Sequence, residues 1–356
     1  MKNKAVKFLL LVLLTCTSCS SIYRFTVDIQ EPAPVTLPVS AQNVLILNNA
    51  VTQPDDQGIE RTFDGKAIPA NYPLSLDSMI WSATDEIANV LNDSHFFNKV
   101  AVYQDSLRTN AGDNWLSITG LSPEDQADFY NNDNFDALFV INRLLFSARE
   151  DVKRMQTYSS TELTGFVDLR ADAVITCSMY VYGKDKPLTT FSIADSLFTK
   201  SVLSGDSTIF FKEVPEYMFN ELSRNLGNMA AMRFVPTWKT VDRLFFTNYA
   251  ARMQEATGYA ANRQWATAES IWTTELGKTK KPVDKAKVAF NLAVANEMQD
   301  KLNPAWEWAQ KAKEQLKDNN PKNAEEVEFI NKYISELEQR IQNNRLLDYQ
   351  WGKDSN

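Results

Sequence analysis

Histidine and cysteine are scarce in this chain of 356 residues, which has one histidine and three cysteines. His95 follows the turn-forming residues 92–94, and no second ligand lies at the spacing that a zinc site needs. We therefore expect His95 to lie at the end of a helix, where the helix dipole favours its positive charge. Cys177 lies on the apolar side of an alternating run. We interpret Cys177 as a small buried hydrophobic residue rather than a nucleophile.

Glycine is also scarce, with 11 residues, and the chain has neither a glycine-rich phosphate loop nor a Gly-x-Ser-x-Gly elbow. The polar run at residues 130–134 resembles a calcium loop in composition, but it lacks the spaced glycine and the terminal glutamate of an EF-hand. Asp168 and Asp172 lie four residues apart along a predicted strand, too far apart to share a proton or an ion. The sequence therefore predicts no catalytic residue, no metal site and no cofactor.

Positive charge is in deficit, since the formal net charge is −8 and the isoelectric point is near 5.0. Phosphate binding needs a concentrated basic face, so this balance excludes nucleic acid as a partner.

The 44% of apolar residues is enough to build the cores of two domains. Those cores depend on packing, because one thiol would remain after cleavage before Cys19 and no intramolecular disulfide could form.

The first eighteen residues have the three parts of a secretory signal. Three lysines precede an apolar run at residues 8–14, and small residues follow at 15–18. That run is shorter than the roughly 20 apolar residues that span a bilayer. The sequence Thr17-Ser18-Cys19 resembles the site that lipoprotein signal peptidase reads, whereas Cys16 would need Leu14 at a position that prefers a small residue. We predict that residues 1–18 are removed and that Cys19 carries the lipid.

Residues 19–40 are polar and contain the prolines of Glu31-Pro32-Ala33-Pro34 and Pro38. This composition favours extended polyproline geometry over packing. We expect a tether that lifts the folded part off the membrane.

Residues 41–245 have the pattern of an α/β domain. Apolar runs at 44–47, 100–103 and 137–141 alternate with an amphipathic helix at 76–91 and a helix that starts at Ser122-Pro123, which predicts a βαβαβ core. Alternation with a period of two over 167–181, a turn at 183–187 and a returning segment predict a long antiparallel hairpin. A helix from Pro215 to Pro236 follows.

Residues 246–356 form a predicted all-α domain, so the predicted fold class of the whole chain is α+β. Two stretches within residues 250–316 resemble tetratricopeptide repeats, in which small residues let two helices approach closely. The matching residues are Ala256, Tyr259, Ala268 and Trp272, then Ala293, Ala305, Ala309 and Ala312. The offset of 37 residues, where the repeat has 34, and Glu275 at a position usually held by alanine depart from that pattern. A final helix from residue 324 to about 345 would cap the stack.

Tryptophans in this domain are candidate partner contacts. Trp306 and Trp308 lie two residues apart, so they do not share a helix face and cannot both be buried against the same neighbour. Either one of them is partly exposed, or the last helix packs over both. Because tryptophan and tyrosine are overrepresented at binding hot spots, we predict contacts at Trp306, Trp308, Trp265 and Tyr259.

The layout also resembles a family of uncharacterised outer-membrane lipoproteins of the Bacteroidota, known as a domain of unknown function. The residues that carry this resemblance are Glu31-Pro32-Ala33, Phe96-Phe97, Phe135-Asp136-Ala137-Leu138, and Pro236-Thr237-Trp238 before Arg243. The resemblance implies an outer-membrane address and supplies no activity.

Three functional hypotheses follow. The first is a lipid-anchored scaffold or adaptor, with no catalysis, whose helical repeat-like domain binds an envelope protein. The second is a homo-oligomeric assembly or secretion component, because the βαβαβ core resembles periplasmic domains of curli-secretion lipoproteins and of the Tol system. The third, an envelope hydrolase, rests only on scattered carboxylates. No acidic run follows Cys19, which favours the periplasmic face of the outer membrane over the cell surface.

Overall fold

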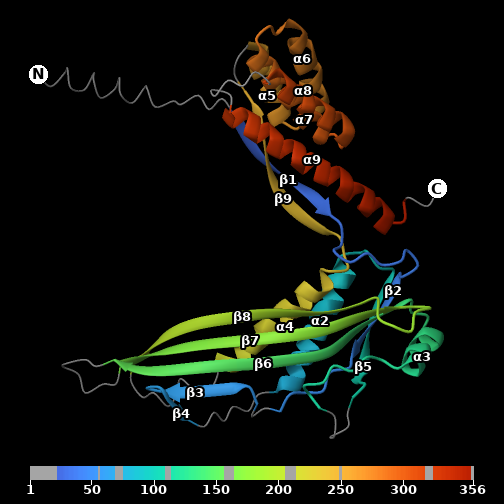
Figure 1. The fold of residues 1–356 in the computed structure, drawn as a ribbon, viewed down its shortest axis with the longest axis vertical. Coiled ribbons are helices and arrows are strands. Elements are labelled where there is room, and N and C mark those ends of the chain that lie inside the picture. Colours follow the sequence, from blue (N-terminus) through green and yellow to red (C-terminus); the bar gives the residue numbers. More distant parts are fainter. Residues whose placement is uncertain are drawn as a thin grey trace, which may run out of the picture. The chain divides into compact units, whose positions relative to one another are not determined.

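The computed structural model describes residues 22–54, 57–68, 75–108, 114–155, 164–204, 214–247, 251–316 and 324–353. The predicted signal peptide and Cys19 lie outside these residues. The chain divides into two compact units (Figure 1). The helical unit comprises the chain up to Glu31 together with Trp238–Leu346, and the sheet unit comprises Pro32–Thr237 and Leu347–Asn356. The α+β class is confirmed, with strands concentrated in the N-terminal half and helices in the C-terminal half.

Three parallel strands form the centre of the sheet unit. Strand β2 (Asn43–Asn48) lies between β5 (Lys99–Ser106) and the first part of β6 (Ala137–Met155). Helix α2 (Leu76–Asp93) precedes β5, and helix α3 (Pro123–Asp133) connects β5 to β6. The predicted start of α3 is confirmed in detail, because Ser122 and Asp125 form a reciprocal capping box and Pro123 occupies the first turn.

A short hairpin that was not predicted from the sequence precedes α2. It consists of β3 (Ile59–Phe63) and β4 (Lys66–Ile68), and β3 pairs in parallel with the second part of β6. Its turn contains Asp64 at φ 48° and Gly65 at φ 78°. Positive φ at both positions is what a two-residue hairpin turn requires, and Asp-Gly provides it at low cost.

The second part of the sheet is a long antiparallel meander. Strand β7 (Thr164–Val181) pairs with β6 on one side and with β8 (Thr189–Ser204) on the other. Helix α4 (Val214–Ala231) packs on β7, on β8 and against α2 (Figure 1). The inward residues of β7 are therefore buried, and Cys177 among them is fully buried, as predicted. His95 lies at the end of α2 in a left-handed conformation with φ 52°.

In the residues that the structure describes, the helical unit contains a strand pair and five successive helices. The helices are α5 (Ala251–Ala261), α6 (Trp265–Lys278), α7 (Pro282–Glu297), α8 (Leu302–Gln315) and α9 (Ala324–Gln350), of which α9 belongs to this unit up to Leu346. Helices α5 to α8 pack in sequential pairs. Helix α7 is buried on all sides from Val288 to Glu297, which makes it the central helix. No helix in the described ranges combines the length and the apolarity needed to cross a bilayer.

The expected tether differs from the structure in the residues that are described. Ile22–Glu31 forms strand β1, which pairs with β9 (Thr237–Phe246). The prediction of an extended tether rested on the prolines and left out the packing of Tyr23 and Phe25. The Tyr23 ring stacks on Phe245 with centroids 4.9 Å apart, and the Phe25 ring lies 5.4 Å from that of Trp265. Aromatic packing therefore makes this segment part of the helical unit, and the predicted all-α domain contains a strand pair.

The end of the chain also differs from the expected domain division. Residues from Leu347 onward belong to the sheet unit. The Gln350 side chain accepts a hydrogen bond from the backbone N–H of Ala33 at 2.9 Å and donates to its carbonyl at 3.0 Å, and the Trp351 ring lies 5.1 Å from Phe96. These contacts could not be predicted from local sequence patterns, because 317 residues separate Gln350 from Ala33.

Candidate functional site: a pocket beside strand β9

A buried ion cluster connects β9, α7 and α9. The Arg243 guanidinium of β9 donates to both carboxylate oxygens of Glu297 at the end of α7, with Nε–Oε2 at 2.8 Å and Nη2–Oε1 at 2.9 Å. Tyr333 and Arg340 of α9 donate to the same carboxylate at 2.7 and 2.8 Å. The Glu297 side chain is 0% exposed and that of Arg243 is 4% exposed. The cluster therefore fixes the three elements relative to one another.

The pKa shifts in this cluster favour charged forms of Glu297 and Arg243 and the neutral form of Tyr333. Burial by itself would raise the pKa of Glu297, but the hydrogen bonds and charges of Arg243 and Arg340 outweigh it and leave the pKa below its ordinary 4.5. Burial would likewise lower the pKa of Arg243, yet Glu297 holds that pKa above its ordinary value. Burial, reinforced by Glu297, raises the pKa of Tyr333. None of these groups exchanges a proton near neutral pH, so the cluster has a positioning role.

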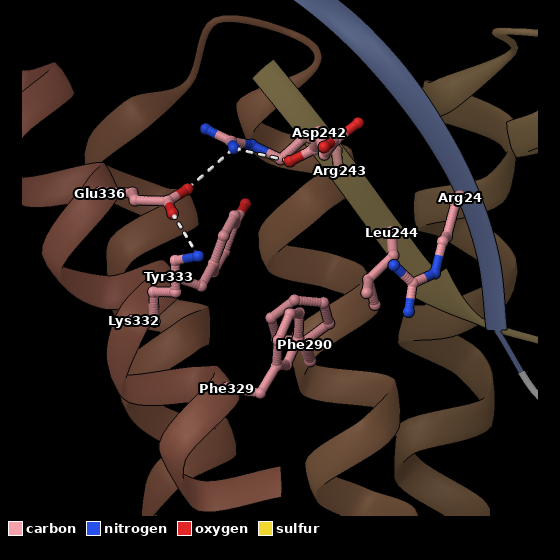
Figure 2. Close-up of a pocket in the computed structure, with 9 residues that line it drawn as sticks. All are labelled: Arg24, Asp242, Arg243, Leu244, Phe290, Phe329, Lys332, Tyr333 and Glu336. Carbon is pink, nitrogen blue, oxygen red and sulfur yellow. Dashed lines mark hydrogen bonds and ion pairs between the residues drawn. The ribbon is translucent and has the colours of Figure 1, made fainter. Parts of the chain in front are cut away.

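A pocket of about 290 Å³ lies against this cluster in the helical unit (Figure 2). Leu244, Phe290, Phe329 and Tyr333 supply its apolar surface, and the Phe290 and Phe329 rings lie 5.1 Å apart. Arg24, Asp242, Arg243, Lys332 and Glu336 supply its charged groups. In Figure 2 the guanidinium of Arg24 lies next to Leu244, and Leu244 lies between it and the two phenylalanines in this view.

The charges at the rim differ in how well they are paired. Arg243 donates to Glu336 at 2.9 Å, and Lys332 lies 4.0 Å from the same carboxylate. An exposed pair such as Lys332–Glu336 contributes little to stability. Among the residues that the structure describes, no carboxylate pairs with the guanidinium of Arg24, and no cation pairs with the carboxylate of Asp242. Arg24 is thus an available cation beside an aromatic surface.

The four aromatic residues predicted as partner contacts are all partly buried in the helical unit, and none of them lines this pocket. The Trp306 indole N–H donates to Glu338 of α9 at 2.9 Å, and the Lys311 ammonium lies 4.1 Å from the centre of the Trp308 ring. Trp265 packs on β1, and Tyr259 packs on the core around α5 and α6. Trp306 and Trp308 both contact the core of the unit, so neither projects freely. Their role as contacts stays a prediction.

Sequence reasoning missed most of the pocket, although one signal was present. Residues 288–297 are apolar except for Asn291, Asn296 and Glu297. A glutamate at the end of such a helix needs a buried partner, since burial of an unpaired charge is costly. The identity of that partner could not be derived, because Arg243 lies 54 residues away in a strand that was not predicted.

Further pockets lie among the described residues of the sheet unit. One of about 680 Å³ is lined by mostly half-buried polar side chains of α2 and α4, and one of about 310 Å³ lies between α3 and the turn that joins β7 to β8. The described ranges contain no group of three or more histidine, cysteine, aspartate or glutamate side chains that could hold a metal ion. Neither pocket has an aromatic surface held in place by a buried ion cluster.

Comparison with known proteins gives a family and no activity. Residues 41–246 match the model of a family described as Domain of unknown function (DUF8603), and residues 254–339 match a second one, Domain of unknown function (DUF6340). The first match covers more than half of the chain, so the chain belongs to the DUF8603 family. The prediction of an uncharacterised family is confirmed to that extent. No curated protein matches the sequence.

Several solved structures show a distant likeness. The PelC dodecamer from Paraburkholderia phytofirmans is 9% identical over 59% of this chain and 98% of its own, with a TM-score of 0.19. Protein XCC0632 from Xanthomonas campestris is 12% identical over 56% of this chain and 87% of its own, with a TM-score of 0.22. The hypothetical protein CT253 from Chlamydia trachomatis is 13% identical over 54% of this chain and 96% of its own, with a TM-score of 0.19. TM-scores this low support no conclusion about function.

Proposed function

We propose that this chain is a lipid-anchored scaffold of the bacterial cell envelope that binds a polypeptide partner at the pocket beside β9. The observation that carries the proposal is an aromatic surface with an available arginine, held by a buried ion cluster. Aromatic residues and arginine are the residue types enriched in the cores of protein interfaces and at their hot spots. The pocket is preorganised, because Arg243 and Glu297 fix its walls, and preorganisation lowers the entropic cost of binding.

The proposed location rests on the sequence. Residues 1–18 have the pattern of a secretory signal, and Thr17-Ser18-Cys19 resembles a lipoprotein cleavage site. A lipid on Cys19 would hold the protein at the outer membrane, facing the periplasm. The proposed tetratricopeptide-like character of α5 to α8 supports the same function, since stacked helix pairs offer surfaces to peptides.

The test is crosslinking in intact cells followed by mass spectrometry of the recovered membrane complex. We expect crosslinks from residues 238–346 to one envelope protein. Arg24→Glu and Phe329→Ala should each weaken the recovery of that protein. Arg252→Glu on α5, an exposed arginine outside the pocket, is the matched control and should leave recovery unchanged. Equal recovery with all three variants would rule out this pocket as the binding site.

A homo-oligomeric assembly is the second candidate, favoured by strand β8. This strand of 16 residues pairs only with β7, so one of its edges has no neighbouring strand in the described residues. An open strand edge is a template for pairing with another chain. Self-crosslinks concentrated in residues 164–204 would favour this candidate over the scaffold.

A further inference from the structure

Strand β9 has one open edge. In the described part of the chain it pairs only with β1. Lys239 near the start of β9 donates to Glu31 at the end of β1 at 2.9 Å, whereas Phe245 near the end of β9 stacks on Tyr23 near the start of β1. The two strands are therefore antiparallel. In an antiparallel strand the N–H and C=O of one residue point to the same edge, and successive residues alternate between the two edges.

Asn291 shows which residues of β9 face the open edge. The N–H of Phe246 donates to Asn291 Oδ1 at 2.8 Å, and Asn291 Nδ2 donates to the carbonyl of Phe246 at 2.7 Å. These are the two bonds that a residue of a neighbouring antiparallel strand would make. The backbone of Phe246 therefore points to α7 rather than to β1. Leu244 and Asp242, two and four residues earlier, face the same edge.

That edge borders the pocket, because Asp242, Arg243 and Leu244 all line it. The carbonyl of Asp242 already accepts a bond from Arg243 Nη1 at 3.0 Å. Within the described ranges no side chain bonds to the N–H or the carbonyl of Leu244. Leu244 is thus the position at which the open edge offers both backbone groups to the pocket.

We propose that the pocket takes an extended peptide segment, which adds as a third strand at Leu244. This proposal deepens the proposed function and rests on it. Main-chain hydrogen bonds supply affinity in strand addition, and pockets for alternate side chains supply specificity. One apolar side chain of the segment packs on Phe290 and Phe329. One acidic side chain meets the guanidinium of Arg24, which lines the pocket and lies next to Leu244 (Figure 2).

The charges of the rim define the segment further. Arg24 and Lys332 favour an acidic residue, whereas the unpaired carboxylate of Asp242 and that of Glu336 repel a second one. A segment with a single acidic residue near a large apolar residue fits these charges, and a run of acids does not. A helical ligand satisfies its own backbone groups and would leave Leu244 without a partner.

The test starts from a peptide selected for binding. A random library of 12-residue peptides is selected on the full-length chain in detergent, and the tightest binder becomes the probe. We expect the selected peptides to share an acidic residue within two positions of a large apolar residue. Slower hydrogen exchange at the Leu244 amide on binding would report a backbone bond at that position.

Two substitutions separate the backbone of Leu244 from its side chain. Leu244→Pro removes the N–H that faces the pocket, and proline is tolerated on an edge strand where the N–H has no ladder partner. Leu244→Ala is the matched control, because it removes the side chain and keeps the N–H. We expect Leu244→Pro to bind the probe at least tenfold more weakly than Leu244→Ala, with circular dichroism unchanged in both.

A second measurement leaves the protein unaltered. N-methylation of successive peptide residues should abolish binding at every second position only, since alternate residues of a strand face β9. Strand addition would be overturned if both Leu244 variants bound the probe equally, or if the methylation effects did not alternate. It would also be overturned if the selected binders were amphipathic helices, or if no binder were selected at all. A partner whose recovery depends on Arg24 and Phe329 would still support the scaffold in any of these cases, so the two failures are distinguishable.

Discussion

At the scale of single residues, Glu297 accepts hydrogen bonds from Arg243, Tyr333 and Arg340 while fully buried. Glu297→Ala would remove the fully buried carboxylate that pairs with Arg243 and leave that guanidinium only the exposed carboxylate of Glu336. Loss of one member of a buried ion pair typically costs about 3–5 kcal/mol. We expect a decrease of that size in the free energy of unfolding, measured by urea titration with tryptophan fluorescence. Glu328→Ala, an exposed control on α9, should change it by less than about 0.5 kcal/mol; similar losses in both variants would contradict the assigned role.

The same residue predicts a pH dependence. The folded-state pKa of Glu297 lies below its ordinary 4.5, so its contribution to stability is fully present above that pH and is lost as the pH falls through the folded-state pKa. We expect the stability difference between the wild type and Glu297→Gln to be constant from neutral pH to about 5 and to shrink below about 4.5. Urea midpoints at a series of pH values measure this. A stability difference between the wild type and Glu297→Gln that grows as the pH falls would contradict the predicted direction of the pH dependence.

Cys177 gives a third prediction. The thiol is fully buried between β7 and α4, and burial raises its pKa well above the ordinary value. Because the thiolate is the reactive form, the native protein should not react with a maleimide at Cys177 over hours, while the urea-unfolded chain should react within minutes. Mass spectrometry of the Cys177 peptide provides the measurement. Rapid labelling of the native chain would show that α4 does not cover β7 persistently.

At the scale of elements, strand β1 stabilises the helical unit through Phe25. The Phe25 ring lies 5.9 Å from Phe245 and 5.4 Å from Trp265. A fully buried phenylalanine costs about 3–5 kcal/mol when truncated to alanine, and Phe25 is partly buried, so we expect about 2 kcal/mol for Phe25→Ala. The exposed neighbour Thr26→Ala is the control for unfolding measured by fluorescence. Equal stability of the two variants would mean that β1 does not pack as described.

The elements that could be predicted are those specified by local sequence. The alternation over residues 167–181 predicts β7, and Ser122-Pro123 with an acid three residues after the serine predicts the start of α3. Strand β3 had a usable signal in Asp64-Gly65, which was overlooked. The sequence signal of strand β9 was misleading, because Arg243, Phe245 and Phe246 are all buried. Their order breaks the alternation that is expected of a strand with one solvent-exposed face.

The pocket could not be predicted, because its walls come from distant parts of the chain. Arg24 lies on β1, whereas Leu244, Phe290 and Phe329 lie more than 200 residues later on β9, α7 and α9. No periodicity or spacing relates residues at that separation. The sequence predicted partner binding by the C-terminal helices, but the tryptophans it singled out are elsewhere on the helical unit.

At the scale of the whole molecule, the proposed membrane attachment depends on one cysteine, Cys19. Each buried CH₂ of an acyl chain contributes about 0.8 kcal/mol, and two or more chains make anchoring effectively stable. We therefore expect Cys19→Ala to move the protein from the membrane to the soluble fraction and to abolish palmitate labelling, while Cys16→Ala retains both. Fractionation and labelling of intact cells measure this. Loss of the label in Cys16→Ala alone would place the lipid three residues earlier. A soluble Cys19→Ala protein that still binds the selected peptide would establish that anchoring and peptide binding depend on different residues of the chain.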